Sequence, residues 1–117
     1  MREQDIQRAI IDALNTVGCR VWRTNAGKIQ KDGYFIQALP AGYPDISGFR
    51  KRDGKAVFIE VKTATGKLRP AQKEFANEIQ HYNVLYGVAR SVEDAIAIVN
   101  SGERNEEHGT HINRPRF

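Results

Sequence analysis

The sequence predicts an α/β fold, a mixed central sheet flanked by helices, with its elements in the order αβββαβα. Three observations predict it. Apolar residues recur at helical spacing near the N-terminus and in two later segments. Short alternating or apolar runs, bounded by turn residues, separate these segments and predict strands. A chain of 117 residues is long enough for one domain with a real core, but not for two.

The first part of the chain predicts a helix, a strand and an irregular segment. The helix is expected over about Glu3–Val17, and Gly18 is well suited to end it. Cys19–Arg23 alternates in polarity and predicts the first strand. Asn25–Gln37 is basic and is punctuated by Asp32-Gly33, so we expect a loop or a loose hairpin there.

Two further strands are expected to pair at the centre of the sheet. They cover about Asp45–Arg50 and Ala56–Lys62. The intervening segment, Arg52-Asp53-Gly54-Lys55, is a turn signal, so the two strands should form a hairpin.

The second half of the chain predicts helix, strand and helix. Pro70 is well placed as the first helical residue, where its missing N–H costs nothing, and Asn83 suits the left-handed geometry of a helix end. Val84–Ala89 predicts the fourth strand. Ser91 then caps the last helix, with Asp94 three residues later as a variant of the capping box. The side chains expected to face inward from these two helices are Ala71, Phe75, Ala76, Ile79, Val92, Ala95, Ile96 and Val99.

Composition bounds the class of protein. We expect one domain over residues 1–100 and a polar, flexible tail over 101–117, because that tail lacks apolar periodicity. No apolar run approaches bilayer-spanning length and no signal-peptide pattern opens the chain, so we expect no membrane association. The single cysteine, Cys19, excludes an internal disulfide and fits a reducing, cytoplasmic location. We interpret it as a small buried hydrophobic residue rather than a nucleophile.

The positive charge is unevenly distributed. The formal net charge is +4, but residues 1–68 hold 12 Lys and Arg against 7 Asp and Glu, whereas residues 69–117 hold 6 against 7. A basic first half suits a polyanionic substrate. A basic surface kept for solubility is the alternative.

Two short motifs in that basic half indicate chemistry. The segment Gly42-Tyr43-Pro44-Asp45 places one carboxylate at the start of a strand, and Ile59-Glu60-Val61-Lys62 ends the next strand. Because strand side chains alternate, Glu60 and Lys62 should point the same way while Val61 points into the core. Two carboxylates beside a lysine can hold a hard divalent cation next to a positive charge that handles water, which suits phosphodiester cleavage. Surface carboxylates in salt bridges are the alternative.

This arrangement resembles the PD-(D/E)XK nuclease superfamily and its restriction-endonuclease-like αβββαβ core. The closer resemblance is to the VRR-NUC family of virus-type replication and repair nucleases, over about residues 3–99. The matching pieces are Glu3, Arg23-Thr24-Asn25-Ala26-Gly27, Gly42-Tyr43-Pro44-Asp45-Ile46, Ile59-Glu60-Val61-Lys62, Leu68 with Gln72, and Arg90-Ser91-Val92-Glu93-Asp94-Ala95. The chain departs at Arg69, where the family often has Ser or Thr, and at Asn83, where it often has Gly; neither departure touches the metal motif.

The resemblance implies a Mg²⁺ or Mn²⁺ ion bound by Asp45, Glu60 and the backbone carbonyl of Val61, with the ion lowering the pKa of the attacking water. Lys62 would orient that water and offset the charge of the transition state. Beside two carboxylates it should keep its proton, so we favour an electrostatic role over that of a free general base.

Two helical residues are also implied. Glu3 matches a glutamate of the first helix that approaches the metal site; the alternative is a first-turn glutamate that serves the helix dipole. Gln72 matches a glutamine of the second helix that would contact a metal ligand or a phosphate; the alternative is a solvent-facing side chain.

Candidate DNA contacts cluster near the first strand. Arg23, Asn25, Lys28 and Lys31 could each be solvated surface, but together they form a basic segment beside the site. Tyr43 could stack on a sugar or base, or pack as a turn aromatic.

The leading hypothesis is a metal-dependent endonuclease that cuts branched DNA. Small stand-alone members of the family resemble Holliday junction resolvases and act as homodimers, which implies paired sites for opposing nicks in repair or recombination. A flap or nicking nuclease subunit of a replication complex and a non-cleaving DNA-binding module are the alternatives. Intact Asp45, Glu60 and Lys62 argue against the module. A virus or phage origin stays open.

Overall fold

The computed structural model describes residues 1–24, 28–37 and 39–108. The elements along these residues are α1 (Glu3–Thr16), β1 (Cys19–Arg23), β2 (Lys28–Lys31), β3 (Tyr34–Gln37), β4 (Ile46–Arg50), β5 (Ala56–Val61), α2 (Pro70–Ile79), β6 (Leu85–Ala89) and α3 (Val92–His108).

A four-stranded mixed sheet organises the fold, as the sequence predicts. The strand order is β1-β4-β5-β6, with β1 and β4 antiparallel, β4 and β5 antiparallel, and β5 and β6 parallel. The hairpin β4–β5, which carries both acidic motifs, is therefore central. The parallel pair β5–β6 requires a crossover, and α2 makes it.

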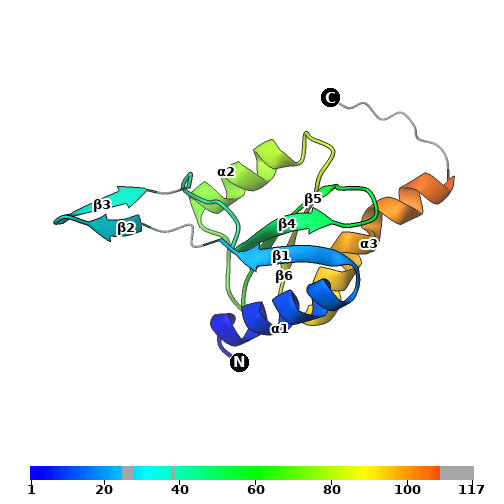
Figure 1. Ribbon diagram of the computed structural model, residues 1–117, viewed down its shortest axis with the longest axis horizontal. Coiled ribbons are helices and arrows are strands. Elements are labelled where there is room, and N and C mark those ends of the chain that lie inside the picture. Colours follow the sequence, from blue (N-terminus) through cyan, green and yellow to red (C-terminus); the bar gives the residue numbers. More distant parts are fainter. Residues whose placement is uncertain (25–27, 38, 109–117) are drawn as a thin grey trace.

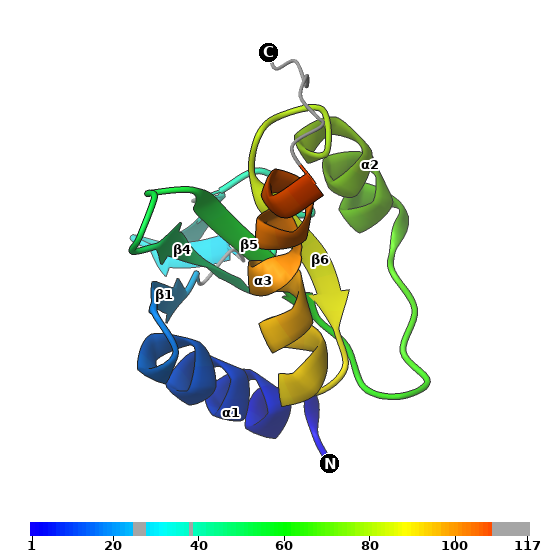
Figure 2. The same ribbon diagram turned by 90° about the vertical axis from the view of Figure 1, so that its right-hand side faces the viewer.

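The helices cover the two faces of the sheet unequally. α1 lies on one side and α2 on the other (Figure 1), and α3 runs along the sheet beside α1 (Figure 2). Gly87 of β6 lets α3 approach, because a Cβ there would lie 2.4 Å from Ile98 Cδ1. Burial of apolar side chains between the sheet, α1 and α3 contributes roughly 1.5–3 kcal/mol per large residue. This core consists of Ile6, Ile10, Leu14, Cys19, Val21, Ile46, Val57, Ile59, Val61, Leu85, Ala89, Ala95 and Val99.

Cys19 is 1% exposed, and burial raises the pKa of its thiol, which agrees with its interpretation as a small hydrophobic residue. On α2, Ala76 is buried as expected, whereas Ala71, Phe75 and Ile79 are only half-buried.

The helix ends agree with the prediction at one position and not at another. Gly18 follows α1 with φ 114°, the left-handed geometry that glycine adopts readily. Asn83 was expected to end α2 in the same way, and this expectation is wrong: among the described non-glycine residues only Asp32 has a positive φ. The helix already ends at Ile79, where the side chain of Gln80 donates to the Ala76 carbonyl at 2.8 Å.

The segment expected to be a loop or a loose hairpin contains the hairpin. β2 and β3 form a separate two-stranded antiparallel sheet that projects away from the four-stranded sheet (Figure 1). Asp32 and Gly33 both have positive φ, at 50° and 86°, as a two-residue type I′ turn requires.

The last helix is longer than the sequence indicates. Ser91 Oγ accepts from the Asp94 N–H at 3.1 Å, and the Asp94 carboxylate accepts from the Arg90 N–H at 2.9 Å, which gives the predicted cap a reciprocal form. α3 then continues to His108, beyond the boundary expected at residue 100. Glu and Arg have high helix propensity, so a segment that contains them can be helical even where apolar periodicity is lacking. No helix in the described ranges has the length and apolar character to cross a membrane.

Candidate active site

The predicted site lies at the end of the sheet where β1 and β5 end and β4 begins. The N-termini of α1 and α2 and the base of the β2–β3 hairpin lie at the same end, on the left of Figure 1. Segments far apart in the sequence therefore meet there.

The end of β5 supplies two of the predicted groups. Glu60 and Lys62 point to the face that carries α2, whereas Val61 is fully buried on the opposite face, as strand alternation requires. Glu60 is only 2% exposed and Lys62 only 6%. Both charged groups therefore sit inside the protein, where a charge is costly unless it is compensated.

The loop before β4 brings Asp45 to the same point. The Asp45 Oδ2 atom accepts a hydrogen bond from the Val61 N–H at 2.9 Å. This bond takes the place of a strand ladder, because the pairing of β4 with β5 stops at Ile46 and Ile59. The carbonyl of a strand residue points to the same side as its N–H, so the Val61 carbonyl also faces the Asp45 side.

Two contacts fix that loop. Thr24 at the end of β1 donates through Oγ1 to the Pro44 carbonyl at 2.7 Å and through its N–H to the Asp45 carbonyl at 3.0 Å. Gly42 has φ 83°, and a Cβ there would lie 2.2 Å from the Ala71 carbonyl oxygen. The first turn of α2 therefore packs directly on the loop backbone, which only glycine allows.

The environment of Glu60 favours its protonated form when no cation is present. Its pKa is raised to about 8, first by burial and then by the hydrogen bond and the negative charge of Asp45. Lys62 lowers this pKa, and the charge of Glu3 raises it further. The carboxyl groups of Asp45 and Glu60 thus lie close enough to interact, although they are fifteen residues apart in the sequence.

Gln72 links the site to α2. Its Nε2 donates to Glu60 Oε2 at 2.9 Å, and its Oε1 accepts from the Arg69 N–H at 2.8 Å. One side chain therefore caps the helix and holds the Glu60 carboxyl group. This cap explains how Arg69 can replace the usual Ser or Thr. Gln72 is 5% exposed, which excludes the solvent-facing alternative.

The loop after β5 is held by Arg90, which directly follows the neighbouring strand β6. Arg90 donates through one guanidinium nitrogen to the carbonyls of Thr63 and Gly66, at 2.6 and 2.7 Å. This clamp fixes the chain just after Lys62 and before α2.

Glu3 lies at the start of α1, close enough for its charge to act on Glu60. Within the described ranges, however, no three His, Cys, Asp or Glu side chains form a group that could hold a metal. Glu3 is therefore not brought into one ligand cluster with Asp45 and Glu60.

The candidate DNA contacts lie in different settings. Arg23 donates through Nε to Gln7 Oε1 of α1 at 2.9 Å. Lys28 and Lys31 begin and end β2, and Asn25 lies outside the described residues. Tyr43 packs edge-on against Phe58 and Phe75, with ring centroids 5.8 and 5.3 Å away, so it holds the loop against α2. Its contact with DNA stays a prediction.

Comparison with known proteins identifies the family. The VRR-NUC domain model matches residues 1–93. The chain belongs to the VRR-NUC domain family. A solved structure described as a VRR_NUC domain protein has the same fold, with a TM-score of 0.52, 16% sequence identity, and coverage of 86% of this chain and 87% of that one. No curated protein matched the chain. Family membership implies a nuclease with DNA as its substrate.

The donor set of this VRR-NUC domain suits a hard divalent cation. Two carboxyl groups lie close enough to interact, one of them almost completely buried, and the other bonds the backbone of Val61, whose carbonyl is directed to the same side. Mg²⁺ and Mn²⁺ prefer such oxygen donors, and Mg²⁺ typically needs only one or two carboxylates from the protein.

Sequence reasoning missed four residues that support this VRR-NUC site. Thr24 and Arg90 belong to segments that carry the resemblance, but their roles depend on the backbone carbonyls they meet. Gln7 lies one helical turn after Glu3, and its 8% exposure follows from the bond to Arg23. Tyr86 is close enough to Glu60 that burial and the carboxylate charge raise its pKa to about 12.

Proposed function

We propose that this VRR-NUC domain is a metal-dependent endonuclease that hydrolyses phosphodiester bonds in branched DNA. The observation that carries the proposal is the burial of Glu60 and Lys62 at the end of β5, where the Asp45 carboxylate bonds the Val61 N–H that lies between them. A non-cleaving DNA-binding module has no need to bury this combination of charges, which is costly for stability.

Asp45, Glu60 and the Val61 carbonyl would hold Mg²⁺ or Mn²⁺, which supplies a site of positive charge that polarises the phosphate and lowers the pKa of the attacking water. Lys62 places a further positive charge where the transition state gains negative charge. Gln72 keeps Glu60 in one orientation, because its own amide is fixed by the helix cap. Glu3 acts on the site through its charge.

In this proposal the DNA backbone binds to the surface around this end of the sheet. Arg23 lies next to the site at the end of β1, and the β2–β3 hairpin, which begins at Lys28, extends from it (Figure 1). Phosphate contacts of this kind position the substrate without reading its sequence. Affinity should therefore fall steeply with salt.

Metal dependence is the first test. Labelled linear, nicked, flapped and four-way DNA should be incubated with the protein in Mg²⁺, Mn²⁺, Ca²⁺ or EDTA. We expect cleavage in Mg²⁺ and Mn²⁺, none in EDTA, and little in Ca²⁺, because its looser coordination shell places the water poorly. Cleavage that survives extensive chelation would contradict the mechanism.

Variants separate the site from a contaminating nuclease. Asp45→Ala and Lys62→Ala should lose cleavage but still bind DNA, whereas Asp12→Ala, an exposed carboxylate of α1, should cut like the parent. If Asp45→Ala and Asp12→Ala cut equally well, the site is misassigned.

Preference for branched DNA is tested by competition. A homodimer with two sites would engage two arms of a junction at once, so a four-way junction should compete better than a linear duplex of equal length. Light scattering gives the oligomeric state. A strict monomer that binds both DNAs equally would favour a flap or nicking nuclease instead.

A further inference from the structure

An aromatic and cationic surface lies on the open half of the sheet face that carries the site. Trp22 on β1 and Phe49 on β4 are 49% and 40% exposed, and their ring centroids lie 6.5 Å apart. The Arg20 guanidinium lies 4.8 Å from the Trp22 ring centroid. We call these three residues the stacking surface.

The strand register places this surface on the same face as the catalytic groups. Arg20 pairs with Phe49 and Trp22 with Ser47, and Ser47 in turn pairs with Phe58. Phe58 is two residues before Glu60, so all these side chains point to one face. α2 covers the part of this face that holds Phe58, through the contact of Phe58 with Phe75, and leaves the part formed by β1 and β4 open.

The stacking surface also lies at a distance from the proposed cleavage site that a DNA strand can span. Trp22 lies one strand across and two residues along from Asp45, which is roughly 8 Å from the strand spacing and rise. That distance spans two to three stacked nucleotides at about 3.4 Å each. A DNA strand cut at Asp45 and Glu60 could therefore reach Trp22 with its neighbouring bases.

The chemistry favours unpaired bases. Aromatic rings and guanidinium planes bind bases by stacking, and only unpaired bases expose their faces. Exposed Arg20 and Lys51 add positive charge beside the rings, which suits a strand of phosphates.

We propose that Arg20, Trp22 and Phe49 bind unpaired nucleotides that flank the cleaved phosphate, so that the substrate includes a single-stranded segment. This inference rests on the proposed nuclease function and narrows its substrate. It makes a three-nucleotide or longer unpaired stretch at a flap or junction the preferred context, on the estimate of about 3.4 Å per nucleotide.

The tryptophan reports on this contact directly. Trp22 is the single tryptophan of the chain, so its fluorescence comes from the stacking surface alone. Titration with oligo-dT of about 12 nucleotides, in EDTA to prevent cleavage, should quench this fluorescence, because stacked bases quench indole emission. Blunt duplex of equal length should quench it much less. Unchanged emission when anisotropy shows the labelled oligonucleotide bound would overturn the inference.

Binding variants give a second measurement. Trp22→Ala should weaken oligo-dT binding about 5- to 150-fold, as expected for loss of one stacked base at about 1–3 kcal/mol. Trp22→Phe should restore most of the affinity, and blunt duplex binding should change little. Tyr82→Ala is the matched control, since Tyr82 is 53% exposed and lies just before β6, the edge strand opposite β1. Equal loss for oligo-dT and duplex would overturn the inference.

A second copy of the chain is the other occupant the test detects. If Trp22→Ala converts a dimer to a monomer in light scattering and oligo-dT leaves the parent's emission unchanged, the surface is a self-interface and the inference fails. The nuclease assay is read separately. Cleavage without quenching would contradict base binding at the stacking surface but support the nuclease function. Quenching without cleavage in any metal would contradict the nuclease function but support base binding.

Discussion

The two ends of the β4–β5 hairpin hold carboxylates in opposite environments. At one end Glu60 is buried against another carboxyl group, and its pKa rises to about 8. At the other end Asp53 receives two bonds from the Arg50 guanidinium, at 3.1 and 2.7 Å, and this arginine holds the Asp53 pKa at about 2. The same hairpin therefore carries one carboxyl group, Glu60, whose ionised form is destabilised, and one, Asp53, whose ionised form is stabilised by hydrogen bonds.

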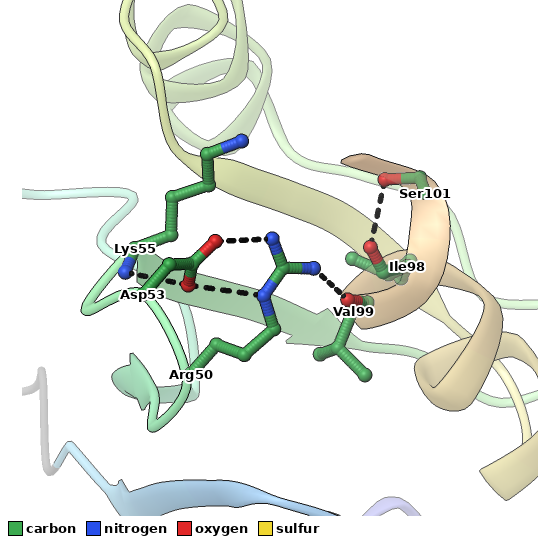
Figure 3. Close-up of polar contacts among 6 residues, drawn as sticks. All are labelled: Arg50, Asp53, Lys55, Ile98, Val99 and Ser101. Atoms are coloured by element: carbon green, nitrogen blue, oxygen red, sulfur yellow. Dashed lines mark hydrogen bonds and ion pairs between the residues drawn. The ribbon is translucent and has the colours of Figure 1, made fainter. Parts of the chain in front are cut away.

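The Arg50 end is built for stability. Figure 3 shows Arg50 between Asp53 and the Val99 carbonyl, to which it also donates, so that it ties the β4–β5 turn to α3. Arg50 is 3% exposed, and Asp53 accepts from the Lys55 N–H as well. The Arg50 guanidinium and the Asp53 carboxylate thus both have partners within the protein. At the Glu60 end two carboxyl groups instead lie close together, an arrangement that suits the proposed binding of a cation.

The largest expected difference between the two ends concerns activity. Glu60→Gln should reduce cleavage to the background of the assay, because it removes a proposed metal ligand, while Asp53→Asn should cut at the parental rate. A radiolabelled flap substrate in Mn²⁺, assayed well below the melting temperature, measures both. If Glu60→Gln retained activity, the difference between the two ends of the hairpin would have no bearing on cleavage.

A smaller loss is expected at Gln72. Gln72→Ala should reduce turnover by about 10- to 100-fold, as is typical when a residue that orients a metal ligand is removed. Gln80→Ala is the matched control, because the Gln80 side chain bonds a carbonyl of the adjoining helix, at Ala76, and not a group of the site. Thermal melting of both variants separates the loss of the α2 cap from the loss of the Glu60 contact. A Gln72→Ala enzyme as active as Gln80→Ala would show that Glu60 needs no support.

At the opposite end the expected effect is on stability alone. Arg50→Met should lower the free energy of unfolding by about 1–3 kcal/mol, because bonds from a charged donor to Asp53 and the Val99 carbonyl are lost. Urea denaturation measures this change. Below its melting temperature the variant should cleave DNA normally. A loss of turnover in folded Arg50→Met would mean that the two ends are coupled.

The last expected difference is an opposite dependence of stability on pH. Metal-free protein should lose stability as the pH rises from about 5 to 8, because Glu60, with a pKa raised from 4.5 to about 8, must then ionise in a buried site. The Asp53 contribution is present above 3.8 and is lost as the pH falls toward 2. Urea midpoints across this range, in EDTA, test both signs.

Glu60→Gln should remove the dependence of stability on pH between pH 5 and 8, and Asp53→Asn should remove the loss of stability in acid. If the parent and Glu60→Gln have the same slope between pH 5 and 8, Glu60 is not the group that titrates there.

The sequence by itself determined the features that depend on neighbouring residues. Strand alternation put Glu60 and Lys62 on one face and Val61 on the other, and the turn chemistry of Asp53-Gly54 placed the β4–β5 hairpin. Asp32-Gly33 indicated a loop or a loose hairpin, and the structure decided for the hairpin. These patterns repeat over two to four residues, so they can be read without knowledge of the fold. The resemblance to VRR-NUC nucleases supplied Gln72 and Glu3.

Only the tertiary structure decided which distant groups meet. The register of β4 against β5 brings Asp45 to the Val61 N–H, and the docking of α2 on Gly42 brings Gln72 to Glu60. The same packing leaves Trp22 exposed, because α2 covers only part of its face. Such contacts join segments separated by a dozen or more residues, and their geometry depends on how the whole core packs. No local pattern contains that information.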